Sequence, residues 1–362
     1  MSSSSCGRTR RWPAEWEPHR ATWLSWPHNT ATWPETLDAV EDAFCEIVRA
    51  IVPGEVVEIN VLDAEMADRV RARLAGAGVA DLERVRFRGI PTDDAWVRDH
   101  GGLFVFERDA DGQQHQRLLD FEFDAWGGKY PPWDRDAAVA RQMAQVLRVP
   151  REAIDLVLEG GAIEGDGEGT ILTTESCLLN PNRARPGVDR SRSALEARLA
   201  EAFGARRVLW LGDGIAGDDT DGHIDDLTRF VAPGRVVTIV ADDPADEDFG
   251  VLAANRGRLE GMRDAAGRRL EVIELPTPPA VLGPDGRLPA SYANFYFSNA
   301  ALLVPVFGAD RDREALAILE SVIDDRPIVP IPAQNLVLGL GTVHCLTQQE
   351  PALPASGFRP AD

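Results

Sequence analysis

Four loops with reactive side chains recur along the chain at nearly equal distances. They contain Asp99, Glu159, His223 and Cys345. The first two positions are 60 residues apart, the next two are 64 apart, and the last step of 122 is twice 61. A regular period of this kind is typical of repeated structural units. Five units of about 60 residues in a ring would bring all four loops to one centre, with the unit near 280–295 adding no obvious catalytic residue.

Helical and strand patterns alternate between these loops. Apolar residues at helical spacing predict helices at 35–51, 64–75, 134–148, 189–203, 245–265 and 311–323. Apolar and β-branched runs predict strands at 55–62, 84–90, 154–158, 169–173, 207–211, 230–240, 270–275 and 327–338. Strands that alternate with helices indicate an α/β fold. We expect a single domain over 11–362, with 276–289 as a surface loop inside one unit.

The N-terminal region shows two different compositions. Residues 1–10 are rich in serine and lack the apolar segment of a signal peptide, so we expect a disordered tail. Residues 11–34 contain five tryptophans and four prolines, which predicts a packed loop on the wall of a pocket. No apolar run reaches the roughly 18 residues that a membrane span requires. We therefore expect a cytoplasmic protein.

The chain is strongly acidic. It carries 38 Lys and Arg residues against 59 Asp and Glu residues, a formal net charge of -21. This charge disfavours nucleic acid and anionic membranes as partners. It fits a cationic substrate, although acidity that serves only solubility is an equally good interpretation.

One stretch, 212–226, gathers several aspartates around His223. Such a loop can hold a metal, hold a cationic ligand or be a solvated surface. The spacing Asp221-x-His223-x-Asp225 matches a manganese site, but the further ligands of such a site are not found, so we expect no metal. Flanking carboxylates raise the pKa of an imidazole, which suits His223 to act as a general acid and base.

Cys345 differs from the other cysteines in its surroundings. Glycines precede it, and the polar run 347–349 follows it. A thiolate is a strong nucleophile, and its partner histidine usually comes from elsewhere in the chain, here His223. His344 is adjacent, but on a strand it would face away from Cys345. The competing interpretation is a small buried core residue, which we expect for Cys45 and Cys177.

Two further loops suit a planar cation. Asp99 follows Trp96 and Arg98, and Glu159 precedes two glycines. Carboxylates bind a guanidinium through paired hydrogen bonds, and an indole face packs against it. The alternative is a surface ion pair between Arg98 and Asp99, with Trp96 in the core.

Eight motifs resemble, in the same order, those of bacterial agmatine deiminases. They include Asp94-Ala-Trp-Val-Arg-Asp99 and His344-Cys-Leu-Thr-Gln-Gln349, and they lie at 11–28, 94–99, 123–129, 158–161, 173–183, 214–226, 291–296 and 344–349. The resemblance runs from about residue 11 to residue 352. It implies a five-bladed, pseudo-symmetric α/β propeller of ββαβ units, the pentein fold, with the site on the central axis.

The resemblance also implies a set of site residues. The implied catalytic residues are Cys345 as nucleophile, His223 as general acid and base, Asp99 and Asp225 as ligands of the guanidinium, and Glu159 as support for the imidazole. The implied substrate-binding residues are Trp96, Trp126 and, for the distal amine, Asp219. The implied reaction is hydrolysis of agmatine to N-carbamoylputrescine and ammonia through a covalent amidino-cysteine, a step of putrescine and polyamine biosynthesis. It needs neither metal nor cofactor.

Some positions depart from the family pattern near the pocket. Thr342 stands where asparagine is common, Leu340 interrupts a run of glycines, and His100-Gly-Gly replaces Thr-Gly-Pro. The substrate therefore stays open: it can be agmatine, peptidyl or free arginine, or another small cationic guanidino compound. Whether the chain forms a homo-oligomer also stays open. A metal-dependent agmatinase and a non-catalytic binding propeller are further alternatives, the last disfavoured because Cys345 and His223 are both present.

Overall fold

Five sheets repeat one topology in the described part of the chain, residues 9–109, 111–284 and 286–354 of the computed structural model. In each sheet, an antiparallel strand pair is followed by a helix and by a strand that lies parallel to the second. The helical crossover is required because parallel neighbours must start from the same end of the sheet. The predicted ββαβ units are thereby confirmed.

The elements follow one another unit by unit. The first unit contains β2 (His19–Ser25), α1 (Leu37–Ile51), β3 (Val56–Val61), α2 (Ala64–Gly76) and β4 (Val85–Gly89). The second contains β5 (Leu103–Arg108), β6 (Gln114–Glu122), α5 (Val139–Leu147) and β7 (Arg151–Val157). The third contains β8 (Ile163–Gly165), β9 (Thr170–Thr174), α7 (Arg192–Phe203) and β10 (Arg207–Leu211).

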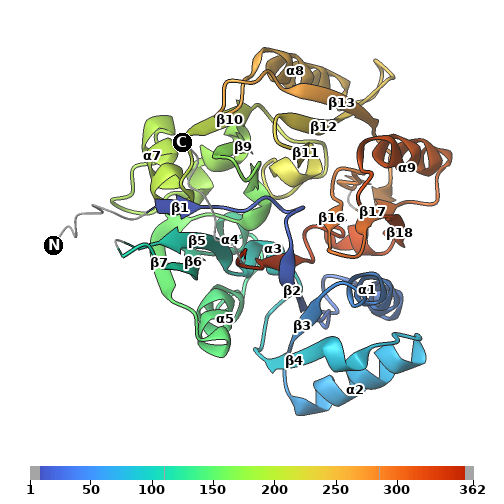
Figure 1. Ribbon diagram of the computed structural model, residues 1–362. Helices are drawn as coiled ribbons and strands as arrows, with labels where there is room; N and C mark the ends of the chain where they lie inside the picture. Colours follow the sequence, from blue (N-terminus) through green and yellow to red (C-terminus); the bar gives the residue numbers. More distant parts are fainter. Residues whose placement is uncertain (1–8, 110, 285, 355–362) are drawn as a thin grey trace.

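The last two units complete a ring. The fourth contains β11 (Thr228–Ala232), β12 (Arg235–Val240), α8 (Phe249–Gly261) and β13 (Glu271–Pro276), and the fifth contains β16 (Tyr296–Phe297), β17 (Leu302–Val306), α9 (Asp310–Val322) and β18 (Ile328–Pro332). The C-terminal strand β19 (Gln348–Pro351) pairs antiparallel with β2, so the end of the chain supplies the missing strand of the first unit. Figure 1 shows the five sheets around the centre of the molecule, with the helices α1, α2, α5, α7, α8 and α9 outside them.

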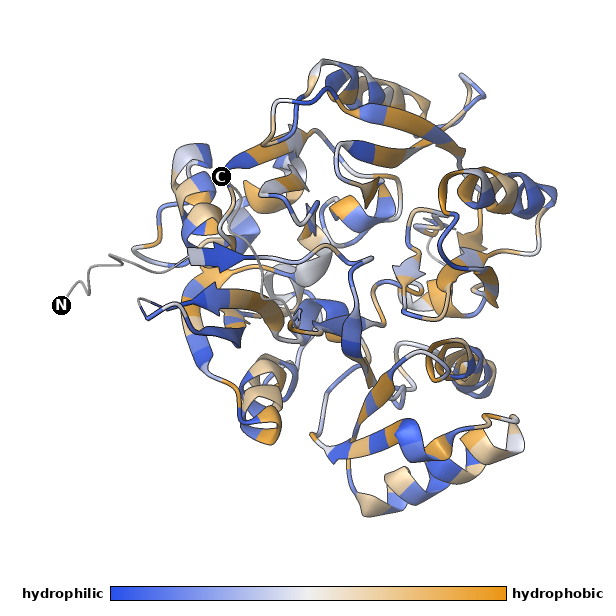
Figure 2. Cartoon of the chain, in the orientation of Figure 1, coloured by the Kyte–Doolittle hydropathy of each residue, from blue (hydrophilic) through white to orange (hydrophobic). Residues whose placement is uncertain are grey.

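The helices cover the sheets with one apolar face each. Helix α1 buries Val40, Phe44, Ile47, Val48 and Ile51, which recur at helical spacing. Figure 2 shows hydrophobic and hydrophilic residues side by side on the helices, as expected for elements with one buried face. None of the helices in the described ranges is long and apolar enough to cross a membrane.

The N-terminal predictions need correction. Residues 11–34 were expected to form a loop, but His19–Ser25 is the buried strand β2 between β19 and β3. Its two faces are both covered, so it lacks the alternation that identifies a half-exposed strand. Residues 1–8 of the expected tail lie outside the described residues, whereas Thr9 and Arg10 belong to β1 (Thr9–Arg11), which pairs with β5. The expected loop at 276–289 contains the short hairpin of β14 (Leu282–Gly283) and β15 (Gly286–Arg287).

Candidate active site

The five connections between consecutive units carry the residues of the site. Asp99 lies between β4 and β5, Glu159 between β7 and β8, His223 between β10 and β11, and Cys345 between β18 and β19. The fifth connection, before β16, holds Asn294, whose side-chain nitrogen is 3.2 Å from the sulfur of Cys345. The prediction that the unit near 280–295 adds no obvious catalytic residue therefore overlooked a direct contact with the thiol.

Gly161 lies at the point where three of these connections meet. A Cβ atom at this position would be 2.6 Å from His223 Nδ1, 2.9 Å from Asp99 Oδ1 and 3.0 Å from Asp225 Oδ2. Only glycine leaves room for the three side chains to approach one another so closely. The Glu159-Gly-Gly sequence is thus explained by the space that the site requires.

Asp99 is held by neutral donors. The backbone N–H of Gly161 donates to Oδ1 at 3.0 Å, and the indole N–H of Trp126 donates to Oδ2 at 3.0 Å. Burial raises the pKa of Asp99, His223 opposes this rise, and the negative charges of Asp225 and Glu159 add to it. A carboxylate accepts about four hydrogen bonds, so Asp99 keeps lone pairs for a cationic ligand.

His223 is buried beside Asp99, with Nδ1 3.9 Å from Asp99 Oδ1. Its backbone N–H donates to Asp218 Oδ2 at 3.0 Å, which fixes the loop that carries the ring. Burial by itself disfavours the charged imidazole, but the negative charge of Asp99 prevails and raises the pKa of His223 well above its usual value. His223 is therefore protonated at neutral pH, as a general acid must be.

Asp225 is held by a histidine instead. His344 Nδ1 lies 2.7 Å from Asp225 Oδ2, and His344 Nε2 lies 2.8 Å from Glu15 Oε2. Burial opposes ionisation of Asp225, but the hydrogen bond and charge of His344 lower its pKa, while Oδ1 has no hydrogen-bond partner. The expected strand at His344 was wrong, because 343–346 form turns and β19 begins at Gln348.

Arg98 belongs to the interior and not to the surface. Its guanidinium is buried and lies 3.1 Å from Glu15, while another nitrogen donates to Gln349 Oε1 at 2.8 Å. Its backbone N–H donates to the carbonyl of Cys345 at 3.2 Å. The alternative of a surface ion pair between Arg98 and Asp99 is therefore wrong, and Arg98 fixes the backbone of Cys345.

Cys345 combines burial with contact to a cavity. It is 6% exposed, and its sulfur lies 3.8 Å from Asp225 Oδ2. Burial raises the pKa of Cys345 well above its usual value, and the negative charges of Asp225, Asp226 and Asp99 raise it further. The free protein therefore holds a thiol and not a thiolate at neutral pH. A cation bound between these carboxylates would favour loss of the proton.

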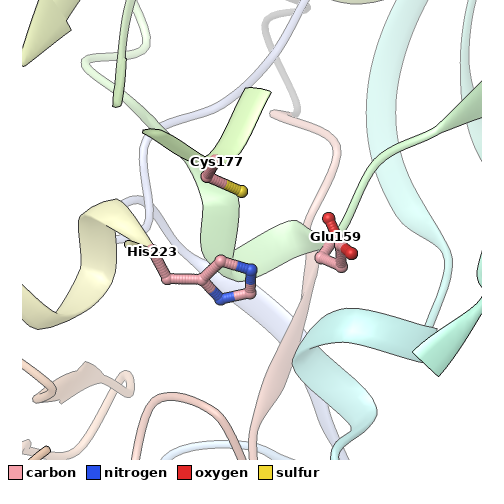
Figure 3. A group of neighbouring side chains, drawn as sticks. All are labelled: Glu159, Cys177 and His223. Carbon is pink, nitrogen blue, oxygen red and sulfur yellow. The ribbon is translucent and has the colours of Figure 1, made fainter. Parts of the chain in front are cut away.

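Glu159 lies on the other side of His223, near Cys177. Ligand-type atoms of these three buried residues all lie within 4.8 Å of one another, and Figure 3 shows them facing one another. This is the geometry of a metal site, yet Arg183 Nε donates to Glu159 Oε1 at 2.8 Å and places a buried cation there. Arg183 and the protonated imidazole already place positive charge at Glu159, so a metal ion would be repelled and the group fits support of the imidazole better than metal binding.

A cavity of about 1140 Å³ opens onto the thiol. Its wall includes Cys345, Asp99, Trp96 and Trp126 from the predicted site, together with Asp219. The other predicted residues do not line the cavity. Asp225 lies 3.8 Å from the sulfur of Cys345, His223 lies 3.9 Å from Asp99, and Glu159 lies beside His223.

The structure pairs Asp219 with groups that the sequence did not reveal. Its side chain is 43% exposed, its carboxylate lies 3.5 Å from Lys129 Nζ, and the hydroxyl of Tyr130 donates to it. A distal amine would therefore share this carboxylate with Lys129.

Three further residues of the site were not predicted from the sequence. Asn294 and Glu15 were given no role, and His344 was not expected to contact the site. Asn294 lies in the 291–296 motif and Glu15 in the 11–28 motif, so both were part of the resemblance without a role. Their contacts bridge long sequence distances, 51 residues for Asn294 to Cys345 and 329 for Glu15 to His344.

Comparisons with known proteins identify the family of the chain. Residues 11–351 match the Porphyromonas-type peptidyl-arginine deiminase family. An agmatine deiminase from Ectopseudomonas mendocina is 38% identical over 94% of this chain and 95% of its own. The structure of an agmatine deiminase of Enterococcus faecalis has a TM-score of 0.85 at 34% identity, covering 94% of this chain and 96% of that one. A putative arginine deiminase from Porphyromonas gingivalis gives 0.84 at 36% identity, covering 97% and 100%. With a match over nearly its whole length, the chain belongs to the Porphyromonas-type peptidyl-arginine deiminase family.

Proposed function

We propose that the protein hydrolyses agmatine to N-carbamoylputrescine and ammonia, with Cys345 as nucleophile. The observation that carries this proposal is the meeting of a thiol, an imidazole and two carboxylates at one cavity. Asp99, His223 and Asp225 surround Gly161, and Asp225 also lies 3.8 Å from the sulfur. The relatives named agmatine deiminase support the same chemistry.

The charge of the cavity wall favours agmatine over arginine. Six aspartates line it, against the three cations Lys129, Arg135 and Arg287. Each cation faces a carboxylate, with Lys129 3.1 Å from Asp221 and Arg287 2.7 Å from Asp246. Agmatine carries a positive charge at both ends, whereas arginine adds an α-carboxylate that this wall would repel.

The first half of the reaction forms a carbon–sulfur bond. The guanidinium binds to Asp99 and Asp225, and its positive charge favours release of the thiol proton of Cys345 to solvent. The thiolate attacks the guanidinium carbon and gives a tetrahedral adduct. His223, protonated because Asp99 raises its pKa, donates a proton to the departing amine. Ammonia leaves, and an amidino-cysteine cation remains, which the two carboxylates stabilise.

The second half breaks that bond with water. Neutral His223 takes a proton from water as the oxygen attacks the amidino carbon. The carbon–sulfur bond then breaks, sulfur leaves as thiolate, and the hydroxyl proton passes to solvent while N-carbamoylputrescine is released. Activity should rise with pH through the raised pKa of Asp99 and fall through the raised pKa of His223.

One assay tests the proposal. Agmatine is incubated with protein treated with EDTA, and ammonia, urea and N-carbamoylputrescine are measured. Equal amounts of ammonia and N-carbamoylputrescine are expected, and urea as the product would contradict the proposal. Cys345→Ser should abolish turnover, while the matched control Cys45→Ser should retain it, because Cys45 lies on the buried face of α1 in the core. Faster turnover of arginine than of agmatine would keep the chemistry and replace the substrate.

The setting of the enzyme is part of the proposal. We propose a cytoplasmic enzyme of polyamine biosynthesis that acts on a small cation and binds no nucleic acid. The net charge of -21 supports this, because it repels a polyanion. Measuring agmatine turnover in a cytosolic fraction, with added DNA as a competitor, tests both points.

A further inference from the structure

The side-chain amide of Asn294 lies against the reactive sulfur. Asn294 is fully buried in the connection that precedes β16. Its Nδ2 lies 3.2 Å from Cys345 Sγ, a hydrogen-bond distance for a sulfur acceptor. The fifth unit thus reaches the central site through an uncharged residue.

The neighbours of the amide determine which of its atoms faces the sulfur. Oδ1 accepts hydrogen bonds from the backbone N–H of His344 at 3.0 Å and from the hydroxyl of Thr342 at 2.6 Å. A backbone N–H can only donate, so the oxygen must lie on that side. The NH₂ group therefore points to Asp226, whose Oδ1 is 3.0 Å away, and it is the part of the amide nearer to the sulfur, 3.2 Å from Sγ against 3.5 Å for Oδ1, which can accept from the thiol but not from a thiolate.

The charges around the sulfur give this contact its importance. Besides burial, the carboxylates of Asp225, Asp226 and Asp99 raise the pKa of Cys345 and so disfavour the thiolate. The amide of Asn294 and the backbone of Thr342 act in the opposite direction as hydrogen-bond donors to the sulfur. Hydrogen bonds to a charged atom are about twice as strong as neutral ones.

We propose that Asn294 is a catalytic residue that donates a hydrogen bond to the thiolate of Cys345, and that Thr342 orients its amide. This inference rests on the proposed function, because it assigns a role within that reaction. The sulfur is a thiolate when it attacks the guanidinium carbon and again when it leaves the amidino carbon. One donor therefore assists both steps.

The test measures the thiol separately from turnover. Asn294→Ala and Asn294→Asp are compared with the native protein by the rate at which iodoacetamide alkylates Cys345, followed by mass spectrometry across pH. The pH of half-maximal alkylation should rise by about 1 to 2, as expected for loss of a hydrogen bond to a charged group. We expect kcat to fall by about 10–100-fold, with KM changed less than threefold.

A matched pair at Thr342 keeps the test valid where a variant at Asn294 fails to fold. Thr342→Val removes the hydroxyl that orients the amide, whereas Thr342→Ser keeps it. The alkylation profile should move to higher pH in Thr342→Val and stay in place in Thr342→Ser.

Identical alkylation profiles in a folded Asn294→Ala and the native protein would overturn the inference, as would identical profiles in the Thr342 pair. Failure of the native protein to convert agmatine would overturn the proposed function. The alkylation profiles would still decide whether Asn294 stabilises the thiolate.

Discussion

Asp99 and Asp225 flank the same point beside Gly161, yet their environments are opposite. Asp99 receives hydrogen bonds from the neutral N–H groups of Gly161 and Trp126, and burial raises its pKa. Asp225 faces His344, whose hydrogen bond and charge lower the pKa of Asp225 against the effect of burial. Two carboxylates that look equivalent in sequence thus have pKa values shifted in opposite directions, downward for Asp225 and upward for Asp99.

This difference allows a buried site to bind a cation and still be stable without one. Asp225 keeps its charge because His344 lies between it and Glu15, which in turn contacts Arg98 and Arg229. Among the described residues, the positive charge nearest to Asp99 is that of His223, 3.9 Å away and beyond hydrogen-bond distance, so a bound guanidinium would add a cation in direct contact with the carboxylate. The fold itself therefore favours the charged form of Asp225, whereas the bound substrate favours the charged form of Asp99.

Removing the charge of Asp225 should have the largest effect on activity. Asp225→Asn should lower kcat/KM by about 1000-fold, because it removes a preorganised ligand of the guanidinium. Loss of the charged partner of His344 should lower the free energy of unfolding by about 1.5–3 kcal/mol. The pKa of Cys345 should fall at the same time, because Asp225 is the largest charge that raises it.

Three measurements check the change at Asp225: steady-state kinetics, urea unfolding and the pH profile of alkylation. Activity should fall while the thiol becomes easier to alkylate. A variant that keeps its activity within tenfold would remove Asp225 from the site.

Removing the charge of Asp99 should have a smaller effect on activity and should also change the pH profile. Asp99→Asn should lower kcat/KM by about 100-fold. Asp99 supplies the largest charge that raises the pKa of His223, so the alkaline limb of the kcat profile should move to lower pH. Trp126→Phe is the control, because it removes a donor to Asp99 and keeps the charge. An alkaline limb that stays in place in Asp99→Asn would show that His223 is not the group that titrates there.

A third change gives Asp225 an environment similar to that of Asp99. His344→Asn retains a neutral donor near Nδ1 and removes the imidazole, so the pKa of Asp225 should rise and the acid limb of the kcat/KM profile should move to higher pH. Near pH 7 we expect about a tenfold loss of kcat/KM, and a larger loss in His344→Ala, which removes the donor as well. Equal acid limbs in both variants and in the native protein would show that His344 does not control Asp225.

The fold could be predicted from the sequence for several elements with one exposed face, but not for all of them: the partly exposed strand β6 was missed, and the strand predicted at 230–240 is the pair β11 and β12. Helix α1 and strands such as β10 were predicted within two residues of their bounds, because apolar spacing reports a buried face. Strand β2 was not predicted, since it is buried on both faces and includes polar residues such as His19 and Thr22. Its ladder with β19 joins the two ends of the chain, which no local pattern can reveal.

From the sequence, the candidate site could be predicted only at residues whose reactive side chains stand in an unusual sequence context. Cys345 and His223 were predicted because a reactive group in a glycine-rich loop is unusual. Asn294 and Glu15 are common residue types, and their importance comes from neighbours that the ring brings together. His344 was set aside because on a strand it would face away from Cys345, and the turn that directs its ring to Asp225 depends on packing.

A third carboxylate, Asp219, should show the smallest effect because it is neither buried nor unpaired. Its exposed carboxylate already faces Lys129 at 3.5 Å, and a partly exposed ion pair contributes about 0.2–1 kcal/mol. Asp219→Asn should therefore raise the KM for agmatine by about twofold to fivefold and leave kcat unchanged. Lys129→Met should lower KM, because the carboxylate is then released to the distal amine. Steady-state kinetics with agmatine distinguish the two variants. If KM moves in the same direction in both, the distal amine binds elsewhere in the cavity, and only Asp99 and Asp225 remain as carboxylates that recognise the substrate.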